Sequence, residues 1–338
     1  MIFVALSVFF LFMNLGCDKK ENSTPATTEQ SKLSVSQKPF RFAVATWVNH
    51  GPFYLAKEKG FYEKYGLIVD IQKIDDIGAQ KLALQAGKLD GTISSVDYFA
   101  TSAAEGIKAK TIMKLGAGDG ADAVVAGEGI NTVAELKGKS VAFEQGGPDH
   151  FLLLFVLEEN GMTSKDIKPV YMTTGDAGAA YVAGAVDACV VWEPWVSNAV
   201  KKRKSNILAT SHERSDVLVD TFVVRNDILE TRKADVIAFM KGWFDAIEYW
   251  KAHPEESNRI MAKGLGIAEE DFAQMLEGVK LSDYQNNLAY FGTESHPGKY
   301  WEVFAEANKI YQQEGIISKP ADPQSATDTS LLIHLYEK

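Results

Sequence analysis

A short stretch that occurs twice constrains the fold of this chain more than any other feature. Residues 183–195 read Ala-Gly-Ala-Val-Asp-Ala-Cys-Val-Val-Trp-Glu-Pro-Trp, and residues 86–98 are a near-copy with Ala, Gly, Asp and a final aromatic at matching positions. Each copy predicts a helix end, a turn at glycine, a short buried strand and a new helix. Pro194 is expected at the first helical position, where its missing N–H costs nothing. Two similar strand-to-helix corners predict two similar lobes that face each other.

The segments around these corners alternate between strand-like and helix-like patterns. This alternation runs through residues 40–115 and is repeated in residues 123–209. It predicts the α/β class, with two Rossmann-like lobes of parallel sheet covered by helices on both faces. The segments 123–126 and 221–225 are predicted to cross between the lobes as a hinge, and a helical tail is expected at the C-terminus. The predicted lobe boundaries are 39–121 with 222–338 for lobe one, and 122–221 for lobe two.

The N-terminus has the features of a secretion signal. Residues 2–13 form an apolar run that is shorter than the ~20 residues of a spanning helix and fits the core of a signal peptide. Asn14-Leu15-Gly16-Cys17 follows and resembles a bacterial lipoprotein processing site, although Asn14 replaces the usual Leu and no basic residue precedes the run. We therefore expect a lipoprotein signal peptide at 1–17, lipidation at Cys17 and a flexible polar tether at 18–38. A plain cleaved signal peptide is the alternative.

Composition argues against several function classes. The formal net charge of −10 disfavours nucleic acid as a partner. The two cysteines show no metal-binding spacing, and Cys189 lies in an apolar run typical of a core. The glycine pattern at 118–123 is a degenerate dinucleotide motif, but it leads into a predicted strand where that motif needs a helix. We expect no enzyme activity, no cofactor and no metal.

Candidate ligand contacts lie where strands end, because ligands of such sheets bind beyond the carboxyl ends of the strands. Helix N-termini also point to that edge and favour anions. Four segments and one further helix start meet this condition. The candidate residues are Trp47, Asn49, His50, Ser94, Ser95, Glu144, Gln145, Gly146, Gly147, His150, Thr174, Asp176, Trp192 and Glu193.

Each candidate has a structural reading beside the functional one. Trp47 and Trp192 either stack on a ligand or pack between the lobes. The backbone of residues 145–147 either binds an anion through its N–H groups or forms a turn. Helix capping is the alternative for the other polar candidates, namely Ser94, Ser95, His150 and Glu193. Asp119 and Asp122 are interpreted as turn residues at the hinge.

Several motifs resemble one known family. Lys-Gly-Phe-Tyr-Glu-Lys-Tyr-Gly-Leu at 59–67, Leu-Gln-Ala-Gly-Lys-Leu-Asp-Gly at 84–91, Leu-Lys-Gly-Lys at 136–139 and Val-Trp-Glu-Pro-Trp at 191–195 are similar to motifs of ABC-transporter solute-binding proteins. The similar group binds aliphatic sulfonates, taurine, nitrate or thiamine pyrimidines. The resemblance implies a type II periplasmic-binding-protein fold, ligand capture in the interlobe cleft, and delivery to a permease with its ATPase. It fits a monomer that works outside the cytoplasm, held to the membrane by its lipid.

The ligand is left open by the sequence. A taurine-like or aliphatic sulfonate ranks first on the resemblance, and an aminopyrimidine or other nitrogenous cation follows. Glu144, Asp149, Asp176 and Glu193 place carboxylates near the expected site, which favours a ligand with a positive group. Nitrate or bicarbonate ranks third, and a surface sensor without a transport role is the alternative from another class.

Overall fold

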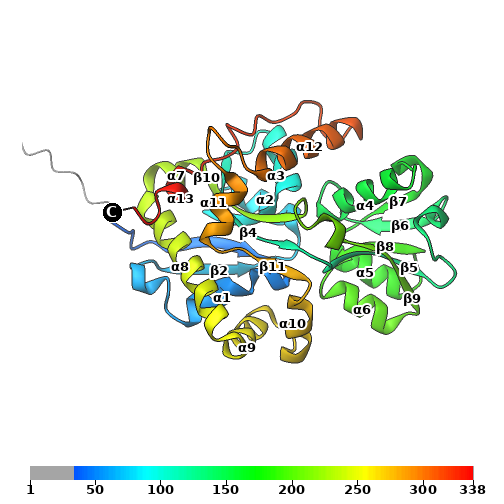
Figure 1. Ribbon diagram of the computed structural model, residues 1–338, viewed down its shortest axis with the longest axis horizontal. Helices are drawn as coiled ribbons and strands as arrows, with labels where there is room; N and C mark the ends of the chain where they lie inside the picture. The colour runs from blue at the N-terminus through cyan, green and yellow to red at the C-terminus, as the bar shows by residue number, and fades with distance from the viewer. Residues whose placement is uncertain (1–33, 338) are drawn as a thin grey trace, which may run out of the picture. The chain divides into compact units, whose positions relative to one another are not determined.

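The computed structural model describes residues 34–337, which belong to one compact unit that begins at Ser34. The predicted signal peptide, the lipidation site at Cys17 and most of the tether lie outside the described residues. Within the unit, eleven strands form two sheets, which we call sheet A and sheet B (Figure 1). No helix in the described part of the chain is long and apolar enough to cross a membrane.

Sheet A has six strands in the order β11-β4-β10-β3-β1-β2. β1 pairs in parallel with β2 and β3, whereas β10 is antiparallel to both β3 and β4. Its strands are β1 (Phe40–Val44), β2 (Val69–Lys73), β3 (Gly91–Ser95), β4 (Ala109–Gly118), β10 (Val219–Arg225) and β11 (Val279–Leu281). We call sheet A with its covering helices lobe A.

Sheet B has five strands in the order β7-β6-β8-β5-β9. β6 is parallel to β7 and β8, and β5 runs antiparallel between β8 and β9. Its strands are β5 (Asp122–Gly127), β6 (Ser140–Phe143), β7 (Lys168–Tyr171), β8 (Ala188–Trp192) and β9 (Ser205–Thr210). Sheet B with its helices is lobe B.

The two sheets share one strand order. Each has three parallel strands in which the first in sequence lies between the second and the third, and then one antiparallel strand. One further strand, β9, follows in sheet B, and two, β4 and β11, follow in sheet A. The second lobe therefore repeats the order of the first, as predicted. The sheets are mixed, however, and not purely parallel. The antiparallel strand in each sheet is the one by which the chain arrives from the other sheet, β5 in sheet B and β10 in sheet A.

The chain crosses between the sheets twice, at positions that differ from the prediction. The predicted crossing strands 123–126 and 221–225 each lie wholly inside one sheet, as β5 and β10. The chain crosses instead through residues 119–121, between β4 and β5, and through residues 211–218, between β9 and β10. Inside a sheet, the backbone N–H and C=O groups of an apolar strand form hydrogen bonds with neighbouring strands. The chain therefore passes from one sheet to the other through the short polar connections.

Helices cover both faces of sheet B because alternate residues of a strand point to opposite sides. In β5, Val124 and Ala126 belong to the core shared with α4, whereas Ala123 and Val125 belong to a second cluster with Tyr181 of α5. Cys189 is a buried free thiol in that second cluster, as predicted. The helices of lobe B are α4 (Pro148–Glu159), α5 (Thr174–Val182) and α6 (Trp195–Lys202).

Aromatic rings form the core of lobe A. Phe42 of β1 lies 5.1 Å from Phe53 of α1 (Gly51–Glu58), and Phe222 of β10 lies 4.4 Å from Phe239 of α8 (Lys233–Ala252), measured between ring centroids. Met240, Trp243 and Ile247 of α8 are also fully buried in this core. The remaining helices of lobe A are α2 (Ile77–Gln85), α3 (Val96–Ala104), α7 (Asn226–Thr231), α9 (Pro254–Leu265), α10 (Glu269–Leu276), α11 (Tyr284–Phe291), α12 (Lys299–Gln313) and α13 (Ser330–Ile333).

The two repeated corners are β3–α3 in lobe A and β8–α6 in lobe B. Ser95 caps α3 by accepting a hydrogen bond from the Tyr98 N–H. At the other corner Pro194 is the N-cap residue and not the first helical residue, which is Trp195. The Glu193–Pro194 peptide is cis.

Candidate functional site

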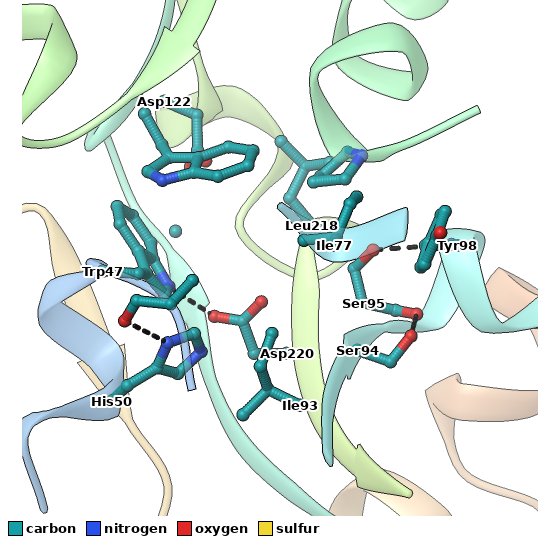
Figure 2. Close-up of a pocket in the computed structure, with 14 residues that line it drawn as sticks. Trp47, His50, Ile77, Ile93, Ser94, Ser95, Tyr98, Asp122, Leu218 and Asp220 are labelled. Atoms are coloured by element: carbon teal, nitrogen blue, oxygen red, sulfur yellow. Dashed lines mark hydrogen bonds between the residues drawn. The ribbon is translucent and has the colours of Figure 1, made fainter. Parts of the chain in front are cut away.

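A small cavity lies between the two lobes, at the carboxyl ends of their parallel strands (Figure 2). Its volume of about 40 Å³ gives room for about three water molecules. The ligand would therefore fill a narrow, largely desolvated space. The lining residues are Ala45, Trp47, His50, Ile77, Ile93, Ser94, Ser95, Tyr98, Gly118, Asp122, Pro148, Trp192, Leu218 and Asp220.

Two tryptophans, one from each lobe, meet at this cavity. The rings of Trp47 and Trp192 are 6.5 Å apart and meet edge to face at 66°. Trp192 is the last residue of β8, and its indole N–H has no partner in the described part of the chain. The rings pack on each other and also line the cavity, and stacking on a ligand stays a prediction.

Asp220 of β10 is held in place by two donors. Trp47 donates its indole N–H to Asp220 Oδ2 at 2.6 Å, and Asn49 donates its side-chain amide to the same oxygen at 2.6 Å. Figure 2 shows the carboxylate of Asp220 directed into the cavity beside His50. Because both bonds use one oxygen, the other oxygen is left for a ligand. Asn49 is therefore a support for Asp220 and does not line the cavity itself.

Asp122 adds a second carboxyl from the start of β5. Its side chain is buried, and Oδ2 has no hydrogen-bond partner among the described residues. Burial, together with the nearby carboxylates of Asp220 and Glu193, raises the pKa of Asp122 to about 7. The close approach requires glycine at 118, because a Cβ there would overlap Asp122 Oδ2 at 1.9 Å. A positive ligand group would hold Asp122 in its ionised form.

His50 provides a neutral acceptor. Its Nδ1 lies 3.2 Å from the carbonyl oxygen of Ala45, and since a carbonyl only accepts, Nδ1 carries the hydrogen. The Nε2 atom then has a free lone pair, and it is buried without a partner in the described chain. Burial lowers the pKa of His50, although the negative charge of Asp220 opposes this effect. His50 therefore remains neutral at pH 7.

The hydroxyls of Ser94 and Ser95 line the opposite wall. Ser95 accepts the Tyr98 N–H as an N-cap, and Ser94 donates to the carbonyl of Ser95 at 3.2 Å. The capping role and the place at the cavity therefore coexist in these residues.

The helix N-termini that point toward the cleft already have carboxylates of this chain beside them. Asp97 lies in the first turn of α3 and Asp149 in the first turn of α4, and both are buried. Asp176 lies in the first turn of α5, where it is exposed and hydrogen-bonded to Thr173. An added anion would meet these groups, so the arrangement is unlike a free anion site.

Glu193 is turned away from the cavity. Its two carboxylate oxygens accept the backbone N–H and the hydroxyl of Ser197, at 3.0 and 2.8 Å. Burial raises the pKa of Glu193. Glu193 therefore caps the start of α6, in line with the capping interpretation. The carboxyls that line the cavity are those of Asp122 and Asp220.

The loop at residues 145–147 differs from the predicted anion-binding loop. The N–H of Gly146 donates to His150 Nδ1 at 3.2 Å, and the N–H of Gly147 donates to the carbonyl of Glu144 at 3.4 Å. These two donors are therefore already used inside the loop. His150 serves this loop and does not line the cavity, and burial lowers its pKa to about 4.

Glu144 and Thr174 lie behind the cavity in lobe B. The Thr174 hydroxyl donates to Asp149 at 2.5 Å and lies 3.4 Å from Glu144. Burial raises the pKa of Glu144 to about 7 and that of Asp149 well above its usual range. Thr174 lines a neighbouring cavity of about 200 Å³ that shares Ala45 and Trp192 with the first.

Sequence reasoning missed the two carboxyls that line the cavity. Asp122 was interpreted as a hinge turn, and Asp220 directly precedes the apolar run of β10. Both residues lie near the start of an antiparallel strand. The start of such a strand lies beside the carboxyl end of its parallel neighbour, so this position could have identified them as site residues. Among residues 34–337, no group of three or more His, Cys, Asp or Glu side chains is arranged to hold a metal ion.

Comparison with known proteins adds family and fold to this geometry. Residues 47–257 match the model of the family described as "NMT1/THI5 like". The chain belongs to the NMT1/THI5-like family. It is 30% identical over 148 residues to the Escherichia coli (strain K12) "Putative aliphatic sulfonates-binding protein", which covers 44% of this chain and 46% of that protein. The match thus spans less than half the length of that relative.

A second relative and a solved structure are also similar. The Haemophilus influenzae "Putative thiamine biosynthesis protein" is 25% identical over 215 residues, covering 62% of this chain and 67% of that protein. The crystal structure of the periplasmic aliphatic sulphonate binding protein SsuA from Escherichia coli superposes with a TM-score of 0.70 at 21% identity, covering 88% of this chain and 100% of that one. The predicted two-lobe periplasmic-binding-protein fold is confirmed by this likeness.

Proposed function

We propose that this member of the NMT1/THI5-like family is the substrate-binding protein of an ABC importer. Support comes from the two-lobe fold, from the cavity at the carboxyl ends of both sheets, and from relatives named as binding proteins. The cavity is small and has walls from both lobes, so a ligand enters when the lobes separate and is held when they close. The partners would be a small solute, a permease and its ATPase, with capture outside the cytoplasm.

The ligand that the cavity fits best carries a positively charged or N–H-bearing nitrogen. The observation that carries this proposal is the set of acceptors at the cavity, namely Asp220, Asp122 and Nε2 of His50. Among the described residues that line the cavity there is no lysine or arginine. The buried carboxyl of Asp122 is costly to ionise without a cation, and a ligand cation beside Trp47 and Trp192 removes that cost.

A purely anionic ligand is supported less well. Asp97 and Asp149 already lie at the helix N-termini that would attract it, and Asp220 and Asp122 would repel it. A taurine-like zwitterion avoids this conflict, since its ammonium group can face the carboxylates. Its sulfonate can then accept from the hydroxyl of Ser95 and from the free indole N–H of Trp192. Simple alkanesulfonates, nitrate and bicarbonate lack the nitrogen donor that this arrangement favours.

An aminopyrimidine is the second candidate. Its planar ring can lie against the tryptophans that line the cavity, and its amino group is a donor for Asp220 or His50. The Haemophilus relative named for thiamine biosynthesis gives this candidate additional support.

The proposal is tested by equilibrium binding of the purified chain to members of each ligand class. An aminopyrimidine, taurine and a series of alkanesulfonates are titrated while the fluorescence of the tryptophans is followed. We expect binding for the nitrogen-bearing ligands and a fluorescence change, because Trp47 and Trp192 line the cavity. Tight binding of alkanesulfonates alone would contradict the ligand class and leave the transport role in place.

Attachment to the membrane remains a prediction from the sequence. Cys17 lies outside the described residues, and the proposal of a lipid anchor rests on the motif around it. Cys17→Ser is expected to release the protein into the soluble fraction of the cells. Retention of that variant in membranes would point to an uncleaved leader in place of a lipid.

A further inference from the structure

The C-terminal helix α12 joins the two lobes. Most of it packs beside α3 in lobe A, but its last turn reaches lobe B. The ring of Tyr311 lies 5.5 Å from the ring of Phe151 in α4. Just beyond the helix, Glu314 accepts a hydrogen bond from Ser164 at 2.6 Å. These contacts place the end of α12 on the seam between the lobes.

The hydroxyl of Tyr311 faces one oxygen from each lobe. It is fully buried, 2.9 Å from Asp97 Oδ2 in lobe A and 3.1 Å from the carbonyl oxygen of Gly147 in lobe B. A hydroxyl has a single hydrogen to donate. If Asp97 is ionised, both neighbours are acceptors and compete for that hydrogen. The carboxylate wins, because a charge-assisted hydrogen bond is the stronger one, and the bond between the lobes is lost.

A proton on Asp97 resolves this competition. The carboxylic acid donates to the Tyr311 oxygen, and the Tyr311 hydrogen then goes to the carbonyl of Gly147. We call this chain of three groups the Asp97–Tyr311–Gly147 relay. In the relay every hydrogen has an acceptor, and the two lobes are joined by a hydrogen bond through a residue of α12.

The surroundings of Asp97 favour the protonated form. Its side chain is fully buried and Oδ1 has no partner in the described chain. Burial raises its pKa to about 6, although hydrogen bonds from the Ser95 and Tyr311 hydroxyls and from the N–H groups of Asp97 and Tyr98 oppose this effect. The titratable groups that face it are Tyr98 of its own helix, Tyr311 of α12, Tyr290 of α11, Asp149 of α4 and Asp122 of β5. Within the described residues none of these is a cation, and the two carboxyls oppose a negative charge on Asp97.

We propose that Tyr311 is a positioning residue for lobe closure, and that a proton on Asp97 frees its hydroxyl to bind Gly147 across the cleft. The inference rests on the proposed function only in that closure of the lobes is the motion that captures ligand. The relay adds a control to that motion: acid strengthens the closed state, even without ligand.

The direction of the pH effect follows from the shift. Asp97 has a higher pKa in the closed protein than an exposed Asp with its usual value of about 4. At a pH below the usual Asp pKa, the proton on Asp97 makes its full contribution to the stability of the closed state. This contribution is lost as the pH rises through about 6. Between pH 8 and pH 5 the closed-to-open ratio gains roughly tenfold from this group alone.

Closure is measured on the ligand-free full-length chain by the distance between two spin labels. Exposed Gln85 of α2 in lobe A and exposed Lys168 of β7 in lobe B are replaced by labelled cysteines, in a Cys17→Ser background where Cys189 stays buried. We expect the closed fraction to rise from pH 8 to pH 5. Asp97→Asn keeps a donor toward Tyr311 at every pH. The increase in its closed-to-open ratio from pH 8 to pH 5 should therefore be roughly tenfold smaller than that of the wild type.

The Tyr311→Phe background separates the relay from the charge of Asp97. At pH 8, Asp97→Asn should increase the closed fraction both with Tyr311 and in the Tyr311→Phe background. The increase should be several-fold larger with Tyr311. Equal effects in the two backgrounds would overturn the proposal. Because no ligand is added, this result is independent of whether any tested solute binds, and failure of the proposed function would be seen separately.

Discussion

At the residue scale, the function of this site depends on how one carboxylate is held. Asp220 is fixed by Trp47 and Asn49 through a single oxygen, which leaves the other to the cavity. A fixed carboxylate loses little freedom when it binds a ligand nitrogen, and such preorganisation favours affinity. Trp47 is therefore both a wall of the cavity and a support for its charge.

Replacement of Asp220 tests this role. Asp220→Asn should weaken the binding of nitrogen-bearing ligands by about tenfold to a hundredfold, because a charge-assisted hydrogen bond is lost. Calorimetric titration gives the affinity. Asp176→Asn is the matched control, since Asp176 is an exposed first-turn residue of α5 outside the cavity lining, and it should leave the affinity unchanged. Equal losses in both variants would indicate a general charge effect and not a contact.

Asp122 gives the site a pH dependence of its own. Its pKa of about 7 in the free protein means that a cationic ligand must displace a proton below that pH. Affinity for a permanently charged ligand such as a quaternary ammonium compound should fall by roughly tenfold per pH unit below 7 and level off above it. Asp122→Asn should flatten this profile. A profile of the same shape in that variant would assign the titration to another group.

At the scale of the elements, glycines allow helices to approach neighbouring side chains closely. Gly242 in α8 lies against Tyr62, and a Cβ at this position would come within 2.4 Å of the Tyr62 ring. Gly178 in α5 is different, since a Cβ there would make an ordinary contact of 3.4 Å with Trp195. The same substitution therefore has opposite consequences in two helices.

Alanine at these two glycines gives a matched pair. Gly242→Ala should reduce the free energy of unfolding by about 1–3 kcal/mol through overpacking, despite the better helix propensity of alanine. Gly178→Ala should leave it unchanged or raise it by up to about 1 kcal/mol. Denaturant unfolding measures both. A stabilised Gly242→Ala variant would mean that Tyr62 moves aside at no cost.

The sequence predicted the elements better than the contacts between them. The repeated corners and the strand–helix alternation specified both lobes and the edge at which a site would form, because those features are local. Trp192 and Ser95, two candidates from the corners, line the cavity. Asp122 and Asp220 were not predicted as site residues, because their meeting depends on β5 and β10 entering each sheet antiparallel. Tyr311 lies 214 positions from Asp97, and no periodicity relates them.

At the scale of the whole molecule, several buried carboxyls make the closed protein sensitive to pH. Burial raises the pKa of Asp97, Asp122 and Glu144 to between about 6 and about 7, and raises that of Asp149 further. A carboxyl whose pKa is higher in the folded than in the unfolded state makes its full contribution to stability at a pH below the unfolded-state pKa. That stability is lost as the pH rises through the folded pKa. The ligand-free protein should thus lose stability between about pH 5 and pH 8.

Thermal unfolding across this pH range checks that expectation. The Tm of the ligand-free chain should be higher at pH 5 than at pH 8, by several degrees. Asp149→Asn should reduce the difference, because an amide at this position needs no proton to be neutral. A Tm that increases from pH 5 to pH 8 would show that the carboxyls are ionised and paired in the folded protein.

The central claim is that the cleft recognises its ligand by a nitrogen that donates to carboxylates. Taurine, ethanesulfonate and ethylamine form a matched set, because the second lacks only the ammonium group and the third lacks only the sulfonate. Calorimetric titration of the chain at pH 8, where Asp122 is ionised, compares them directly. We expect ethanesulfonate to bind at least tenfold more weakly than taurine, and ethylamine to retain measurable binding. Ethanesulfonate binding as tightly as taurine, with no binding of ethylamine, would contradict it.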